Sequence, residues 1–209
     1  MKRYRGDGRV AGRHHRLWIG ILAAAFLGAA AIPASAAPGN PVAEANHQTS
    51  ITVMATTDLH GYALNWDYFN DEPFSTEAGL AKVATLVDQV RADRGSDHTL
   101  LLDNGDTIQG SSLAQYYAKV EPITETGAMH PMATAMNAMS YDAMVVGNHE
   151  FNYGMPFPRT FTEQLTFPVL GANVTEWDTS TPAFDPYIIQ TVKLKGHKPI
   201  RVGVLGVLA

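Results

Sequence analysis

Apolar runs of strand length alternate along the chain with longer segments whose apolar residues recur at helical spacing. Short apolar runs at residues 51–56, 99–103 and 143–146 predict three buried strands. Helical patterns separate them, at residues 77–94 between the first two runs and at 111–119 and 131–140 between the second and third. This order predicts an α/β fold with a largely parallel sheet and helices packed against it.

The pattern continues with three more strand-like runs toward the C-terminus. Residues 167–172 predict a fourth strand. Residues 187–192 and 200–207 are separated by a basic, turn-like stretch and predict a hairpin that enters or covers the same sheet. Because the chain stops directly after a strand-like run, we expect it to be the front portion of a longer protein.

The N-terminal segment has the pattern of a secretory signal peptide. Basic residues precede an apolar, alanine-rich run at 17–32, and Ala-Ser-Ala at 34–36 is typical of a cleavage site. A membrane anchor that stays in place is the alternative, although a spanning helix needs roughly 18 to 20 apolar residues. We therefore expect residues 1–36 to be removed on export to the periplasm, cell wall or extracellular space. Residues 37–49 would then form a linker to a domain at 50–209.

Charge and cysteine content narrow the classes of function. The first 36 residues hold six of the 15 basic residues and one of the 20 acidic residues, which leaves residues 37–209 with a formal charge of −10. An acidic surface repels nucleic-acid backbones, so binding to a nucleic-acid polymer is not expected. The chain contains no cysteine, which excludes disulfides and thiolate-bound zinc.

Each of the first three strand-like runs is followed by a short polar cluster. The clusters are Asp58-Leu59-His60, Gly105-Asp106 and Gly147-Asn148-His149-Glu150. Residues at the carboxyl ends of parallel strands converge, so these groups are candidates for one site. Asp58 and His60 are one residue apart, and in extended geometry both side chains would reach the same ion.

The other two clusters complete a candidate two-metal site. A carboxylate such as that of Asp106 is able to bridge two ions roughly 3.5 to 4 Å apart. The amide oxygen of Asn148 would bind the second ion without adding charge, and His149 would be free to approach the substrate as a proton donor.

Each cluster taken alone also has an ordinary structural explanation. Asn148 would serve as a helix N-cap, and Glu150 would be a first-turn acid favoured by the helix dipole. The neighbouring Asp103 and Asn104 are expected to satisfy local backbone groups rather than bind metal. The occurrence of all three clusters in order, after three apolar runs, favours the metal site.

These motifs resemble the signature of the calcineurin-like metallophosphoesterases. The resemblance rests on Thr-Thr-Asp-Leu-His-Gly at 56–61, Asp-Asn-Gly-Asp at 103–106 and Gly-Asn-His-Glu-Phe-Asn-Tyr-Gly at 147–154, and it extends from about residue 51 to the end of the chain. The motifs look like the 5′-nucleotidase branch and are most similar to its 2′,3′-cyclic-nucleotide 2′-phosphodiesterase/3′-nucleotidase enzymes. The family fold is a four-layer α/β/β/α sandwich, of which this chain would hold the first half.

The resemblance also implies roles for single residues. Asp58 and His60 would bind the first metal, Asp106 would bridge, Asn148 would bind the second metal and His149 would be catalytic. The cofactors implied are two divalent ions, with manganese, zinc, iron and cobalt all suited to these ligands. The reaction implied is attack on a nucleotide phosphoester by a hydroxide that bridges the two metals.

Position 152 discriminates within the branch. Ordinary 5′-nucleotidases have an aspartate where this chain has Asn152, and the exchange is a feature of the cyclic phosphodiesterase group. The residue therefore favours a cyclic phosphodiesterase/3′-nucleotidase. A 5′-nucleotidase or a nucleotide-sugar hydrolase is the alternative enzyme.

Family members also use histidines from later motifs, Gly-His and Gly-His-x-His, and a C-terminal domain that recognises the nucleoside. The chain contains no Gly-His-x-His, and its one Gly-His, at 196–197, lies in the basic, turn-like stretch between two strand-like runs. Its other histidines after the signal segment lack ligand spacing and are expected at the surface: His47, His98, His130 and His197. An inactive truncated fragment is therefore a further alternative.

Overall fold

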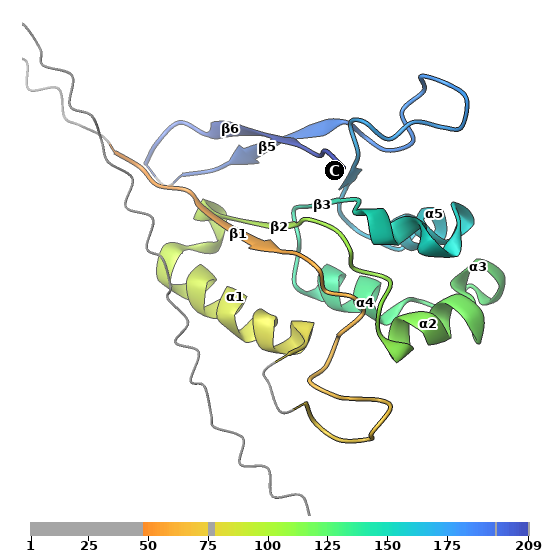
Figure 1. The fold of residues 1–209 in the computed structure, drawn as a ribbon. Coiled ribbons are helices and arrows are strands. Elements are labelled where there is room, and N and C mark those ends of the chain that lie inside the picture. Colours follow the sequence, from red (N-terminus) through yellow and green to blue (C-terminus); the bar gives the residue numbers. More distant parts are fainter. Residues whose placement is uncertain (1–47, 75–77, 195, 209) are drawn as a thin grey trace, which may run out of the picture. The chain divides into compact units, whose positions relative to one another are not determined.

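The computed structural model of the chain describes residues 48–74, 78–194 and 196–208. The predicted signal peptide and most of the predicted linker lie outside these residues. A parallel sheet runs in the order β1-β2-β3-β4 (Figure 1). Its strands are β1 (Thr52–Thr56), β2 (Thr99–Asp103), β3 (Ala143–Val145) and β4 (Val169–Leu170). Thr56 pairs with Asp103, and Asp103 pairs with Met144, so the carboxyl ends of the first three strands lie at one edge.

Helices pack on one face of this sheet. They are α1 (Leu80–Arg94), α2 (Ser112–Lys119), α3 (Ile123–Thr126), α4 (Pro131–Ala138) and α5 (Pro156–Glu163), with short 3₁₀ helices η1 (Ser96–His98) and η2 (Asn148–Tyr153). The main core joins Leu80 of α1, Met136 of α4 and Phe161 of α5 to Leu101 of β2. The three predicted helices are confirmed, with ends that differ by up to three residues, whereas the short α3 and α5 were not predicted.

A hairpin covers the opposite face of the sheet (Figure 1). Its strands β5 (Tyr187–Val192) and β6 (Ile200–Leu205) pair with each other in an antiparallel sheet of their own. Leu100 points away from its neighbour Leu101 and packs with Val192 and Leu194 in a second core cluster. Of the two arrangements that the sequence allowed, the hairpin therefore covers the sheet and does not enter it.

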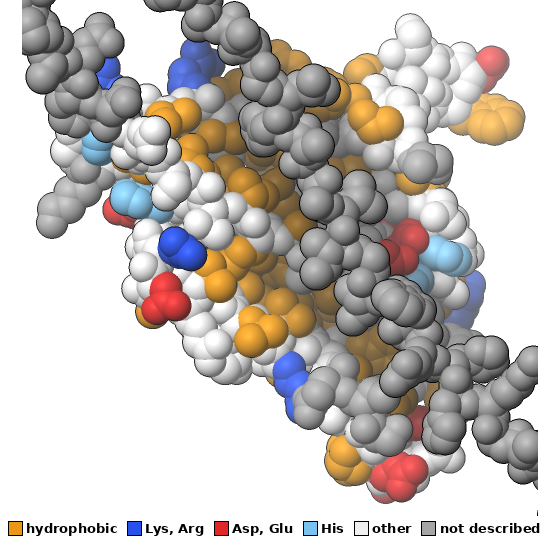
Figure 2. Space-filling view, turned by 60° about the vertical axis from the view of Figure 1, so that its left-hand side comes forward, with side chains coloured by type: hydrophobic (Ala, Val, Ile, Leu, Met, Phe, Trp, Pro, Cys, Tyr) orange, Lys and Arg blue, Asp and Glu red, His pale blue; other side chains and the backbone are white. Residues whose placement is uncertain are grey.

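The prediction that β1 is buried was wrong. Its residues alternate between half-buried and exposed, and Val53 is 57% exposed. Among the described residues, the strand lies at the edge of the sheet and pairs with β2 alone. Ile189 and Leu205 of the hairpin are also exposed, and Figure 2 shows hydrophobic side chains gathered over one face. Among the described residues, none of the helices combines the length and hydrophobicity that crossing a membrane requires.

His130 is fully buried, which contradicts the prediction that it lies at the surface. Its Nδ1 accepts a hydrogen bond from the Met132 N–H at 3.2 Å, which caps the start of α4. The rings of Tyr117, Phe157 and Phe161 surround the imidazole at centroid distances of 5.3 to 6.1 Å. Burial among these rings lowers the pKa of His130 to about 4.

The other predicted surface histidines differ from one another. His197 is exposed and His98 is half-buried. His47 lies outside the described residues.

Candidate metal centre

The loops that follow β1 and β2 are joined by backbone hydrogen bonds. The Asp58 N–H donates to the Gly105 carbonyl at 3.0 Å, and the His60 N–H donates to the Asp106 carbonyl at 2.9 Å. Asp58 and His60 both have left-handed backbone, with φ of 54° and 48°. The prediction of extended backbone at these two residues was therefore wrong. The turned backbone nevertheless brings both side chains to the same place.

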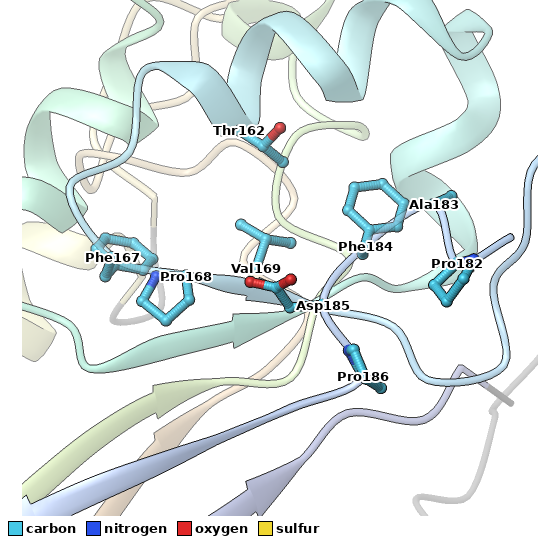
Figure 3. Close-up of a pocket in the computed structure, with 9 residues that line it drawn as sticks. All are labelled: Thr162, Phe167, Pro168, Val169, Pro182, Ala183, Phe184, Asp185 and Pro186. Atoms are coloured by element: carbon cyan, nitrogen blue, oxygen red, sulfur yellow. The ribbon is translucent and has the colours of Figure 1, made fainter.

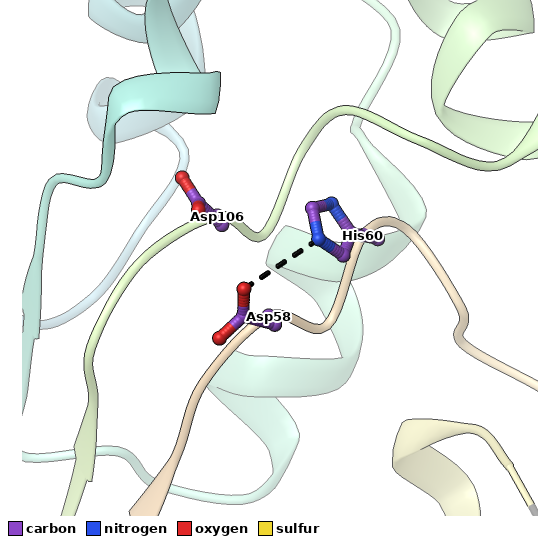
Figure 4. Close-up of side chains that lie close together, drawn as sticks. All are labelled: Asp58, His60 and Asp106. Atoms are coloured by element: carbon purple, nitrogen blue, oxygen red, sulfur yellow. Dashed lines mark ion pairs between the residues drawn. The ribbon is translucent and has the colours of Figure 1, made fainter.

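Three candidate ligands meet above this edge of the sheet (Figure 4). Asp58, His60 and Asp106 each present a ligand atom, and these atoms lie within 4.8 Å of one another. His60 Nε2 is 3.7 Å from Asp58 Oδ1. Carboxylate oxygen and imidazole nitrogen together suit first-row divalent metals such as manganese, zinc, iron or cobalt.

The tautomer of His60 fits metal binding. Its Nδ1 lies 2.6 Å from the Gln109 carbonyl oxygen, and because a carbonyl only accepts, Nδ1 donates the proton. In the neutral ring, Nε2 then has a free lone pair on the side of Asp58. Most metal-binding histidines donate the N–H of the nitrogen that does not bind metal to a carbonyl, carboxylate or water, as His60 does here. The residues present therefore fit a cation.

The loop after β3 brings the remaining candidate residues to the same edge. The His149 N–H donates to Asp106 Oδ1 at 2.8 Å, and the His149 ring lies 5.4 Å from the His60 ring. Asn148 precedes His149, and its side chain is exposed. Asn152 Nδ2 lies 3.0 Å from His149 Nδ1, so when the amide donates, the imidazole Nε2 carries the proton.

Asp103 has the structural role that the sequence predicts. Its buried carboxylate accepts hydrogen bonds from the Gly105 N–H at 3.1 Å, from Thr107 Oγ1 at 2.6 Å and from Thr56 Oγ1 at 2.5 Å. Burial raises the pKa of Asp103 to about 6, against the lowering effect of these donors. Asp103 therefore stabilises the loop that carries Asp106 through hydrogen bonds on both sides of that residue.

Glu150 is an acid in the first turn of η2, as the sequence predicts, but its contacts extend beyond that turn. It is 1% exposed and also accepts hydrogen bonds from residues more than 40 positions earlier in the chain. The position of Glu150 after Gly147-Asn148-His149 gives no sign of these partners. These partners could have been predicted only by knowing that the loop after β2 lies beside Glu150.

Figure 3 shows a pocket with a volume of about 480 Å³, lined by Thr162 of α5, by residues 167–169 and by residues 182–186. None of the candidate ligands contributes to it. The chemistry of the side chains, rather than cavity size, therefore locates the candidate site.

We predict opposite pH dependences of stability from His130 and Asp103 in the metal-free protein. As the pH falls from 6.5 to about 4, the histidine is protonated in the unfolded chain before it is protonated in the folded chain. The contribution of His130 therefore lowers the free energy of unfolding over that range. As the pH falls from about 6 to 3.8, Asp103 is protonated in the folded chain first. The contribution of Asp103 therefore raises the free energy of unfolding over that range. Each slope is at most about 1.4 kcal/mol per pH unit.

Urea unfolding between about pH 6 and pH 4 tests this pair against wild type. Relative to wild type, His130→Asn should become more stable as the pH falls, and Asp103→Asn should become less stable. Both replacements keep a hydrogen-bond acceptor and do not titrate. Parallel pH curves for all three proteins would contradict the prediction.

The comparisons with known proteins agree with this geometry. Residues 51–202 match the model of the calcineurin-like phosphoesterase family. The chain therefore belongs to the calcineurin-like phosphoesterase family, as its motifs predict.

Named relatives in the family act on nucleotides. The chain is 34% identical over 170 residues to the 2′,3′-cyclic-nucleotide 2′-phosphodiesterase/3′-nucleotidase of Haemophilus influenzae, covering 79% of this chain and 25% of the relative. It is 36% identical over 166 residues to the trifunctional nucleotide phosphoesterase YfkN of Bacillus subtilis, covering 76% and 11%. The chain thus spans about a quarter or less of these relatives.

Solved structures confirm the predicted fold class. The crystal structure of the calcineurin-like phosphoesterase YfkN from Bacillus subtilis superposes with a TM-score of 0.68 at 35% identity, covering 76% of this chain and 48% of that one. A putative 5′-nucleotidase from Staphylococcus aureus gives 0.58 at 28% identity, covering 76% and 28%. The described helices and sheets are consistent with the N-terminal half of a metallophosphoesterase domain.

Proposed function

We propose that the full-length protein hydrolyses nucleotide phosphoesters with a pair of divalent cations at the carboxyl ends of β1, β2 and β3. One observation carries the proposal: ligand atoms of Asp58, His60 and Asp106, from two separate loops, lie within 4.8 Å of one another. The hydrogen bond that frees His60 Nε2 supports the same conclusion.

Each residue has a distinct role in this proposal. Asp58 and His60 would hold the first ion, and Asp106 would be a ligand of both ions. Asn148 would hold the second ion through its amide oxygen, which its exposed side chain leaves accessible. When bound, the ions supply activated water at neutral pH and neutralise charge on the phosphate.

His149 supplies the proton. To act as the general acid, His149 would carry protons on both ring nitrogens, with Nδ1 donating to the Asn152 amide turned so that its oxygen accepts; transfer of the Nε2 proton to the departing alkoxide oxygen would then leave a neutral imidazole. The hydrogen bond from the His149 N–H to Asp106 fixes this residue beside the proposed bridging carboxylate. Proton transfer and metal binding thus share one loop.

The substrate we propose is a 2′,3′-cyclic nucleotide and the 3′-nucleotide that follows from it. Asn152 supports this choice over a 5′-nucleotidase. Two relatives named 2′,3′-cyclic-nucleotide 2′-phosphodiesterase/3′-nucleotidase, at 34% and 36% identity, support it as well. A 5′-nucleotidase is the second candidate, since the 5′-nucleotidase of Bos taurus is 33% identical over 128 residues. We further propose that the protein is exported and that a region beyond this chain binds the nucleoside.

Hydrolysis assays on full-length protein test the proposal. With manganese, we expect turnover of 2′,3′-cyclic AMP and 3′-AMP above that of 5′-AMP, and loss of turnover with chelator. His149→Ala should lower kcat by about 10² to 10⁴-fold, because a general acid contributes that much, and should leave metal content unchanged.

The exposed His197 provides a control, because His197→Ala should leave turnover unchanged. Preference for 5′-AMP would favour the second candidate. Turnover that is insensitive to chelator would contradict the two-metal proposal.

A further inference from the structure

The side chain of Glu150 binds four backbone N–H groups from two loops. Its Oε2 accepts from Asp106 at 2.8 Å and from Gly147 at 2.6 Å. Its Oε1 accepts from Thr107 at 2.6 Å and from Ile108 at 3.3 Å. The side chain is 1% exposed, so these bonds are shielded from water, and losing them leaves buried donors without partners.

The hydrogen bonds of Glu150 lie beyond the point where β2 and β3 stop pairing. β2 and β3 pair only through Leu102 with Ala143 and Asp103 with Met144. Within the described residues, no backbone hydrogen bond joins the segment 104–108 to the segment 147–150. The Glu150 carboxylate and the bond from the His149 N–H to Asp106 Oδ1 hold the two loops together instead.

The loop after β1 is attached in a different way. Asp58 and His60 are held to the β2 loop by their own backbone hydrogen bonds, at 3.0 and 2.9 Å, which do not involve Glu150. Loosening Glu150 therefore leaves Asp58 and His60 placed against Asp106. It frees the β3 loop, which carries Asn148 and His149.

We propose that Glu150 is a positioning residue that sets the spacing between Asp106 and the Asn148–His149 loop, and thereby the retention of the second ion. This inference rests on the proposed function, because it requires that Asp106 and Asn148 share an ion. It predicts an asymmetric defect: one ion is weakened while the other is kept. A residue that only stabilised the fold would lower both affinities alike or neither.

The test is Glu150→Gln in full-length protein, with manganese as the probe. The amide keeps the shape of the side chain but has one acceptor oxygen, so its NH₂ group faces N–H donors that it cannot bind. We expect the weaker manganese site to lose about 10- to 100-fold in affinity, the range for residues that orient ligands, while the tighter site is unchanged. Turnover should fall at limiting manganese and recover in part at high manganese.

Two further variants complete the experiment. Glu163→Gln removes an exposed carboxylate at the end of α5 and should bind both ions as wild type does. Glu150→Asp, one methylene shorter, cannot reach both loops and should show the same asymmetric loss. It replaces Glu150→Gln if that variant does not fold.

The outcomes separate this inference from the proposed function. A wild type that binds two ions, with a Glu150 variant that binds both equally well or loses both alike, overturns the inference alone. A wild type that binds no second ion overturns the proposed function and the inference with it. Selective loss of the weaker ion supports both.

Discussion

Replacing Asp106 by alanine is expected to reduce kcat/KM by ~10³-fold or more, because a two-metal clamp contributes several kcal/mol and each 1.36 kcal/mol is tenfold in rate. The Asp106 carboxylate lies with the Asp58 and His60 ligand atoms, and its Oδ1 also accepts the His149 N–H. The substitution therefore removes the proposed bridge and loosens the loop that carries His149, the proposed proton donor. Bound metal should fall together with activity.

Steady-state kinetics and metal analysis of the full-length protein measure this effect. Asp93→Ala is the matched control, because Asp93 is an exposed carboxylate on α1 outside the site. It should leave both quantities unchanged. An Asp106→Ala protein with normal turnover and two bound ions would rule out the bridging role.

Gly147→Ala is expected to lower kcat by about 10²-fold, the cost of misplacing catalytic groups by about 1 Å. A Cβ on Gly147 would lie 2.2 Å from Asp106 Oδ1 and 2.5 Å from the Asp106 nitrogen, so the Asp106 loop would have to move. The φ of Gly147 is −93°, which alanine adopts freely. The effect is therefore one of space at the site and not of backbone strain.

The control for this substitution is Gly203→Ala on β6. A Cβ there meets its nearest neighbour, Ile189, at 3.7 Å, which is an ordinary contact. Both proteins should unfold cooperatively in thermal scans, and only Gly147→Ala should lose turnover. Equal activities would show that Asp106 does not need its observed position.

The convergence of the candidate residues was predictable from sequence because it depends on topology. Apolar runs gave the parallel strands, and the carboxyl ends of neighbouring parallel strands lie at one edge whatever the loops do. Asp58, Asp106 and His149 do lie close together, as this topology predicts. The extended backbone predicted for Asp58 and His60 is wrong, since hydrogen bonds to Gly105 and Asp106 hold them at left-handed φ values.

Burial of polar side chains was predicted poorly, because it depends on neighbours distant in the chain. His130 is the N-cap of α4 and was predicted to lie at the surface, but aromatic rings from α2 and α5 enclose it. Glu150 has the spacing of a helix-capping acid and does accept from Gly147, yet its other partners lie more than 40 residues away. No local pattern encodes such partners.

Diffraction from crystals of the full-length protein loaded with manganese, measured at the manganese absorption edge, would show whether Asp106 bridges two ions. We expect two anomalous peaks roughly 3.5 to 4 Å apart. The Asp106 carboxylate should lie between them, with Asp58 and His60 on one ion and Asn148 on the other. Crystals of active protein with a single peak, or with peaks that these four side chains do not contact, would contradict this expectation.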